Sequence, residues 1–121
     1  MGWKSYEDLD VYQKSYKLAL DIHKASADFP KEEQYSLTSQ LRRSSKSICA
    51  NIVEGQAKSA KSVPEFCRFL NIAVGSAEET RLWIRFCKDL EFLDGAESKK
   101  YDDNYLEIVK MLRGLMKSLR S

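Results

Sequence analysis

The segment from Leu37 to Gly55, LTSQLRRSSKSICANIVEG, constrains the fold of this chain more than any other. At about 100° per residue in an α-helix, its apolar residues fall on one narrow face with small residues between them: Leu37, Leu41, Ser44, Ile48 and Ile52. Small side chains let a neighbouring helix approach closely, so the segment predicts a packing helix of a bundle. The opposite side carries Arg42, Arg43 and Lys46. The plainest interpretation of these cations is a solvated helix back, and a binding role is the alternative.

A first helix is predicted from about Ser5 to Asp28. Residues at spacings of three and four form one stripe along it: Leu9, Tyr12, Tyr16, Ala19 and His23. Phe29-Pro30 ends this helix, because proline disfavours helical geometry in the residue before it. The second helix begins within residues 31–34, where two glutamates suit a helix N-terminus, and continues to about Ala57.

A third helix is predicted from Ser62, as N-cap, to about Leu90, with Pro64 in the first turn and Glu65 at the third position. It has two apolar faces, and a bundle helix needs only one. The second face therefore predicts an oligomer interface, and the mid-helix Gly75 predicts a close helix approach. The first face consists of Phe66, Leu70, Ala73, Ala77 and Ile84, and the second of Phe69, Ile72, Ser76 and Trp83.

A fourth helix is predicted to start near Ser98, after a turn at Asp94-Gly95. Its heptad pattern is Tyr105, Val109, Leu112, Met116 and Leu119, and Ile108 and Leu115 widen the apolar arc into a further interface candidate. A separate stripe carries Lys110, Arg113, Lys117 and Arg120. This stripe either compensates the helix C-terminus or binds a ligand. The prediction is one all-α domain over residues 1–121, an antiparallel up-down-up-down four-helix bundle.

Composition and charge limit the function. The 121 residues carry a formal net charge of +2, too small by itself to indicate a nucleic-acid-binding protein. No secretory leader and no membrane-spanning apolar run is recognisable, so we expect a soluble cytoplasmic protein without a membrane partner. The three cysteines, Cys49, Cys67 and Cys87, each fall within an expected helix and are interpreted as reduced core thiols.

No catalytic or metal-binding pattern is recognisable. A di-iron bundle needs two Glu-x-x-His pairs, whereas this chain has one histidine, His23, with Leu20 three residues before it. The cysteines and His23 lack zinc-ligand spacing, and glycine-rich phosphate loops and nucleophile elbows are missing. The prediction is a protein that is not an enzyme, with no cofactor and no small-molecule substrate.

Three blocks of the chain resemble a bacterial four-helix-bundle family: FPKEEQYSLTSQLRRSSKSICANIVEG (Phe29 to Gly55), FLNIAVGSAEE (Phe69 to Glu79) and KMLRGLMKSL (Lys110 to Leu119). That family includes proteins encoded in intervening sequences of large-subunit ribosomal RNA genes and the accessory variability determinant of diversity-generating retroelements. The chain departs from it modestly, with Cys49 where members often have proline, Val53 where they have alanine and Ser36 where they have glycine.

The resemblance implies a ring of five subunits, and the retroelement members are understood to bind a reverse transcriptase and RNA through basic surfaces. Five copies would raise the net charge from +2 to about +10 and multiply each basic stripe around the ring. The candidate nucleic-acid-binding residues, expected to contact phosphates, are Arg42, Arg43, Lys46, Lys58, Lys61, Lys110, Arg113, Lys117 and Arg120.

Two alternatives remain open, a protein-binding helical scaffold and an intervening-sequence-encoded structural protein, neither with a nucleic-acid role. The chain also lacks the aromatic residues interleaved with cations that single-strand binders use. Trp3 and Tyr6 are the only candidates for stacking on bases.

Overall fold

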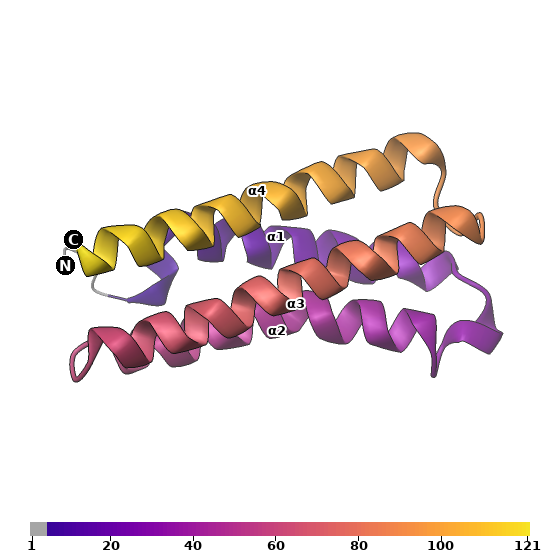
Figure 1. Ribbon diagram of the computed structural model, residues 1–121. Helices are drawn as coiled ribbons and strands as arrows, with labels where there is room; N and C mark the ends of the chain where they lie inside the picture. Colours follow the sequence, from indigo (N-terminus) through magenta and orange to yellow (C-terminus); the bar gives the residue numbers. More distant parts are fainter. Residues whose placement is uncertain (1–4) are drawn as a thin grey trace.

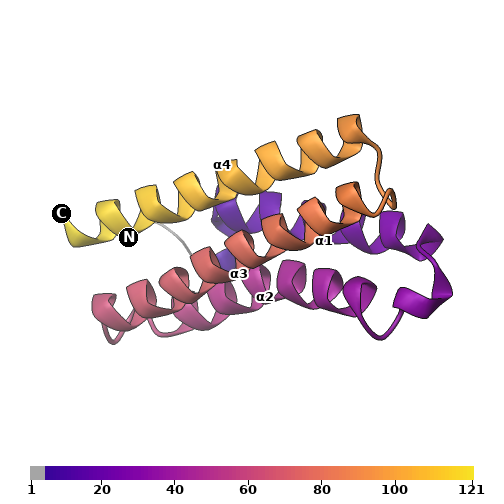
Figure 2. The ribbon, with the colours of Figure 1, turned by 45° about the vertical axis from the view of Figure 1, so that its right-hand side comes forward.

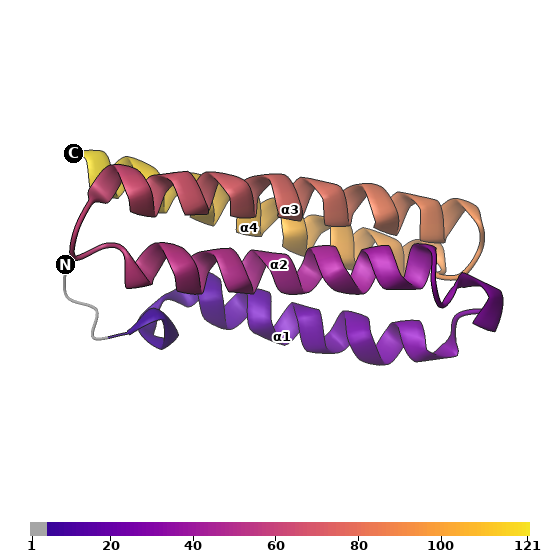
Figure 3. The ribbon, with the colours of Figure 1, turned by 90° about the horizontal axis from the view of Figure 1, so that it is seen from below.

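Four long helices, each antiparallel to the next along the chain, form the computed structural model, which describes residues 5–121. They are α1 (Asp10–Ala25), α2 (Leu37–Ala57), α3 (Val63–Asp89) and α4 (Gly95–Arg120), with short 3-10 turns at Tyr6–Asp8, Ser26–Asp28 and Lys31–Glu33. Each helix packs beside the next, and α4 returns beside α1 (Figures 1 and 3). The predicted all-α, up-down-up-down arrangement is confirmed for this part of the chain. No helix among residues 5–121 is long and apolar enough to cross a membrane.

The buried face of α1 differs from the predicted stripe. Within the helix, Val11, Leu18 and Ile22 are buried around Ser15, whereas Tyr16 is 51% exposed and His23 is exposed. Leu9 and Ala19 are buried, as predicted. Both stripes have helical spacing, and the buried one carries branched aliphatic side chains around Ser15. The tyrosine stripe of α1 therefore faces outward.

The contact between α2 and α3 combines the predicted apolar faces with a chain of hydroxyl groups. Thr80 Oγ1 donates to Ser44 Oγ at 2.8 Å and lies 2.8 Å from the Ser76 carbonyl oxygen, while Ser76 Oγ lies 3.0 Å from Ser47 Oγ. Because these residues are small, the helix backbones approach closely while the buried hydroxyls are paired. The core residues predicted on both helices are buried: Leu37, Leu41, Ser44, Ile48, Ile52, Phe66, Leu70, Ala73, Ala77 and Ile84.

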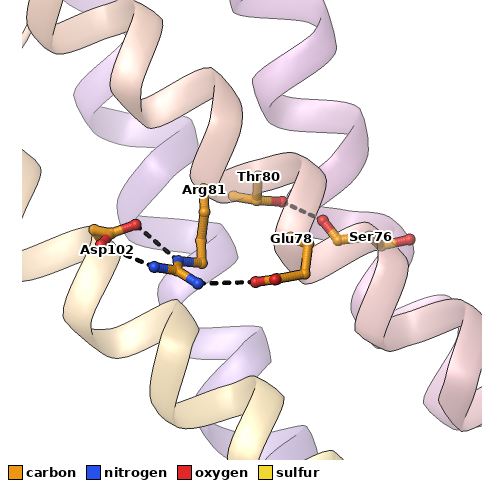
Figure 4. A network of polar contacts seen from close by, with 5 residues as sticks. All are labelled: Ser76, Glu78, Thr80, Arg81 and Asp102. Carbon is orange, nitrogen blue, oxygen red and sulfur yellow. Dashed lines mark hydrogen bonds and ion pairs between the residues drawn. The ribbon is translucent and has the colours of Figure 1, made fainter.

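An arginine joins α3 to α4. Figure 4 shows Arg81 between Asp102 of α4 and Glu78 of its own helix, with Nε 2.8 Å from Asp102 Oδ1 and Nη1 3.0 Å from Glu78 Oε1. A second contact, from Nη2 to Asp102 Oδ2 at 3.3 Å, makes the pair with Asp102 bidentate. Hydrogen bonding to Asp102, followed by that to Glu78, raises the pKa of Arg81. This arginine, with its charge compensated by two carboxylates, links α3 to α4 beside their apolar contact.

Two helices, α3 and α4, begin directly after a residue whose side chain caps the helix N-terminus. Ser62 caps α3 as predicted, its Oγ accepting from the Glu65 backbone N–H at 3.2 Å. The cap of α4 is Asp94, whose Oδ1 accepts from the Glu97 N–H at 2.7 Å, so the helix starts one turn before the predicted Ser98. Ser98 is instead buried in the first turn. Asp94 followed by Glu97 has the residue types of a helix start, and this signal outweighs the serine.

The glycine at a close helix approach is Gly55, and the prediction for Gly75 was wrong within the chain. A β-carbon on Gly55 would lie 2.9 Å from Phe66 Cδ1 and 3.0 Å from Phe69 Cβ, whereas one on Gly75 would meet nothing within 4 Å. The short connector after Ala57 turns the chain directly from α2 into α3 (Figure 2), and Phe66 and Phe69 of the first turns of α3 lie against position 55. Gly75 is exposed on the outside of α3.

Candidate nucleic-acid interface

A row of cations follows one side of the C-terminal half of α4. Lys110, Arg113, Lys117 and Arg120 are all exposed, at spacings that keep them on one side of the helix. Among residues 5–121, none of them takes part in a salt bridge. Three of them line a shallow hollow of about 380 Å³ together with Met116 and Ser121. These side chains are available to an anionic ligand.

The connector between α2 and α3 adds cations at the same end of the bundle. The end of α4 and this connector lie together at one end (Figures 1 and 3), and the connector carries Lys58 and Lys61. Lys58 Nζ lies 5.8 Å from the centre of the Phe69 ring, and Lys61 is exposed. We call these two lysines and the α4 row the basic end: Lys58, Lys61, Lys110, Arg113, Lys117 and Arg120.

Acidic residues at this end lie on another side of α4. Asp8 and Asp10 line a separate hollow with Met111 and Leu115. At about 100° per residue, these two α4 positions point roughly opposite to the basic row. The α4 row therefore faces away from these two aspartates, while Glu65, in the first turn of α3 beside the connector, is paired with Arg68.

The other predicted cations lie further along α2, away from the basic end, and one is used within the chain. Arg42 Nε donates to Ser26 Oγ at 2.7 Å and Arg42 Nη2 to the His23 carbonyl oxygen at 3.0 Å. A cation there compensates the C-terminus of α1, and it is the main cause that lowers the pKa of His23. Arg42 therefore ties α2 to α1. Arg43 Nη2 donates to Gln40 Oε1 at 3.0 Å and Lys46 is exposed.

An apolar groove runs between α1 and α2. It has a volume of about 500 Å³ and is formed by the outward tyrosines of α1 and the small residues of α2. Tyr12 and Tyr16 stack with ring centres 5.9 Å apart, and Tyr6 meets Tyr12 edge-on at 4.9 Å. Trp3, the other residue considered for base stacking, lies outside the described residues. The groove residues are Tyr12, Tyr16, Ala19, Leu20, His23, Lys46, Cys49, Ala50 and Val53.

The predicted interface residues have different environments. Ile72 is 42% exposed, and Trp83 is half-buried with Nε1 donating to Glu79 Oε2 at 2.9 Å. Ser76 contacts Ser47 of α2. The Arg68 guanidinium lies over the Phe69 ring, with Cζ 4.5 Å from the ring centre. Ile108 corrects the prediction, because it is 0% exposed and forms part of the core of the chain. Leu115 is half-buried in the hollow beside Leu9 and Val11.

Sequence reasoning missed the full length of an exposed apolar row on α3. Leu82, Phe86 and Leu90 are 46%, 47% and 51% exposed, and they continue the line of Ile72. Their spacing of four residues was the available signal. We call the whole row the α3 stripe: Ile72, Gly75, Glu79, Leu82, Phe86 and Leu90.

The three cysteines are buried or half-buried, and their surroundings do not favour a reactive or metal-binding thiolate. Cys67 and Cys87 are buried and Cys49 is half-buried, all as free thiols. Burial raises the pKa of Cys49 to about 11 and that of Cys87 to about 12, which disfavours the reactive thiolate. In the part of the chain that the structure describes, no group of three or more histidine, cysteine, aspartate or glutamate side chains could hold a metal ion.

Comparison with known protein families matches residues 7–114 to the 23S rRNA-intervening sequence protein family. The chain belongs to this family. A crystal structure of a protein of unknown function from Bacteroides thetaiotaomicron, assigned to the S23 ribosomal protein family, is 29% identical and superimposes with a TM-score of 0.76. The alignment covers 88% of this chain and 98% of that one. Comparison with curated proteins finds no match.

Membership of the intervening sequence protein family confirms the ribosomal-RNA part of the resemblance. The family description names the genes in which such proteins are encoded, and the similar crystal structure is of unknown function. The link to retroelement accessory proteins stays a prediction, as do the ring and the nucleic acid.

Proposed function

We propose that this intervening sequence family member is a non-catalytic accessory protein that binds nucleic acid through the basic end of an oligomeric ring. The observation that carries the proposal is the row Lys110, Arg113, Lys117 and Arg120, exposed and free of salt bridges among the described residues, beside Lys58 and Lys61. As the resemblance to retroelement accessory proteins implies, the same protein would work beside a reverse transcriptase.

The chemistry of the basic end suits phosphates and not bases. Lysine and arginine contact phosphate oxygens as point charges or forks, and no aromatic side chain alternates with the α4 row. A single chain offers only a small positive excess, so affinity would come from several basic ends contacting one polyanion. The ring therefore belongs to the proposal, with five subunits as the resemblance implies. The exposed apolar α3 stripe and the α1–α2 groove support self-association, since monomers rarely expose such surfaces.

The test removes charge from the basic end without touching the core. The variant Lys110→Gln, Arg113→Gln, Lys117→Gln loses three exposed cations per chain. We expect weaker binding of a single-stranded RNA and a flatter dependence of log affinity on log salt between about 50 and 200 mM, because fewer counterions are released.

The matched control is Lys24→Gln, Lys31→Gln, Lys88→Gln. These three lysines are exposed near the opposite end of the bundle, so the net charge changes equally. The control should bind RNA with nearly the wild-type slope. Equal loss in both variants would mean that only net charge matters and would refute a localised site. Absence of RNA binding by the wild type would refute the proposal and favour the protein-binding scaffold.

A further inference from the structure

We propose that the α1–α2 groove of one copy receives the α3 stripe of the next copy, so that every subunit uses two different surfaces. The inference rests on the ring put forward above and assigns its contact. The occupant of the groove is a second copy of this chain. This assignment does not depend on whether the ring binds nucleic acid.

The groove offers a concave apolar surface with a positive region. The residues of α2 that line it are small or short, from Lys46 through Cys49 and Ala50 to Val53, and the two stacked tyrosines form the opposite wall. Lys46 is its charged residue, His23 is a titratable group whose pKa Arg42 lowers, and no carboxylate of residues 5–121 lines it. A single row of apolar side chains from a helix fits such a surface.

The α3 stripe has the complementary shape and charge. Four exposed apolar side chains follow one side of the helix, with Gly75 leaving the backbone open between them. Glu79 is the one charged residue of the stripe, and the hydrogen bond from Trp83 Nε1 holds its carboxylate on this surface. Docking would set the Glu79 carboxylate against the ammonium group of Lys46.

Charge favours pairing unlike surfaces. A symmetric groove-to-groove dimer would bring Lys46 towards Lys46, and a stripe-to-stripe dimer would bring Glu79 towards Glu79. Like charges that face each other across an interface oppose it. Groove-to-stripe pairing alone joins opposite charges, and it leaves one subunit with an unused stripe and the other with an unused groove, so that further copies can add.

The positions of the two surfaces favour closure into a small ring. The hydrogen-bonding contact between Ser76 and Ser47 marks the side of α3 that faces α2. Around the helix, the stripe extends from Ile72 and Leu90, about 40° from Ser76, to Leu82, about 120° from it. The stripe and the groove thus lie on either side of α2, on adjacent faces of the bundle. Adjacent faces of a four-helix bundle meet at about 90°, close to the interior angles of about 90° and 108° that rings of four and five subunits require.

The experiment blocks one surface at a time. Ala50→Trp fills the groove, and Ile72→Arg places a charge on the stripe; both positions are exposed. Each variant alone should lose the wild-type assembly and elute as a monomer in size-exclusion chromatography with light scattering. An equimolar mixture should form a complex of two chains, because one intact groove meets one intact stripe and the complex cannot extend.

Controls and alternatives are built into the design. Ala96→Trp and Ser118→Arg introduce the same side chains at exposed positions of α4, a helix that contributes to neither surface, and they should assemble like the wild type. If a blocking variant fails to fold by circular dichroism, the pair Lys46→Glu and Glu79→Lys replaces it. Each charge reversal alone should weaken assembly, and the double variant should restore it.

Three results would overturn the inference. A dimer formed by Ile72→Arg alone would indicate groove-to-groove pairing, and a wild-type assembly that survives both blocking variants would place the interface elsewhere. The first result would also remove the ring, because a groove-to-groove contact is two-fold symmetric and gives dimers. The second would leave the ring standing and remove only this assignment. A monomeric wild type would remove the ring and the assignment together, while RNA binding by the basic end would still be decided by its own charge variants.

Discussion

Gly55 shows how one missing side chain controls the approach of α3 to α2. The positions of Phe66 and Phe69 leave a β-carbon at residue 55 only 2.9 Å and 3.0 Å from their side-chain atoms, and 3.2 Å from the Phe66 carbonyl oxygen. Because the last two of these contacts involve a backbone atom or one next to the backbone, rotation of a ring alone cannot relieve the crowding. The two helices would have to move apart.

We expect Gly55→Ala to destabilise the protein by about 1–3 kcal/mol, the usual cost of overpacking. The control is Gly114→Ala, since Gly114 lies inside α4 with nothing within 4 Å of its β-carbon position. That change should stabilise by up to about 1 kcal/mol, the difference in helix propensity. Denaturant unfolding at one protein concentration checks both, because assembly makes stability depend on concentration. Stabilisation by Gly55→Ala would contradict the close approach.

Arg42 is the residue at which sequence and structure lead to different roles. The helical wheel predicts correctly that it leaves the core, and the cation therefore looked available for phosphates. The hydrogen bonds to Ser26 and His23 depend on where α1 ends relative to α2. No periodicity within α2 contains that information.

At the scale of elements, the end of α3 carries backbone strain that a substitution can remove. Glu91 has φ of 66°, and the Phe92 and Glu91 N–H groups donate to the carbonyl oxygens of Cys87 and Lys88 at 2.8 Å and 3.0 Å. This is a Schellman ending, which usually places glycine at the left-handed position.

We expect Glu91→Gly to stabilise the protein by about 1 kcal/mol, because glycine adopts positive φ without the β-carbon penalty. Glu91→Ala removes the same carboxylate but keeps the β-carbon, so it should give no such gain. Thermal unfolding of the two variants at equal concentration separates the backbone effect from the charge effect. A gain of equal size in both would attribute it to the charge.

The helices themselves could be predicted because the apolar faces of α2 and α3 and the cap of α3 agreed with the tertiary structure. The start of α2 was predicted wrongly within residues 31–34, because Lys31–Glu33 forms a separate 3-10 turn and α2 begins at Leu37. For α1, two stripes with helical spacing competed, and bulky tyrosines suggested a core that the structure builds from Val11, Leu18 and Ile22. For α4, Asp94 and Ser98 were both suitable caps. Such choices depend on what a neighbouring helix offers, which the local pattern does not contain.

At the scale of the whole molecule, topology gathers cations that are distant in the sequence. Lys58 and Lys61 precede α3, and the α4 row ends the chain, yet the up-down-up-down order brings both to one end of the bundle. Each of these residues was predicted from the sequence as a candidate phosphate contact. Only the order and direction of the helices separate them from Arg42, Arg43 and Lys46.

The groove and the α3 stripe depend even more on the whole molecule. Neither surface was predicted in full, because exposure is a property of what the rest of the chain leaves uncovered. Ile108 looked like part of a second apolar face and proved fully buried, while Phe86 and Leu90 proved exposed. The apolar residues of a helix predict that it packs against a neighbour. Which helix or which second copy that neighbour is depends on the whole fold.

The most direct test of the central claim, that the basic end binds nucleic acid, is ultraviolet cross-linking of the assembled wild-type protein to a single-stranded RNA, followed by mass spectrometry of the cross-linked peptides. We predict cross-links concentrated in peptides that contain Lys58, Lys61 and residues 110–120. Cross-links concentrated around Lys24, Lys31 and Lys88 at the opposite end, or none above those of an RNA-free control, would contradict the claim.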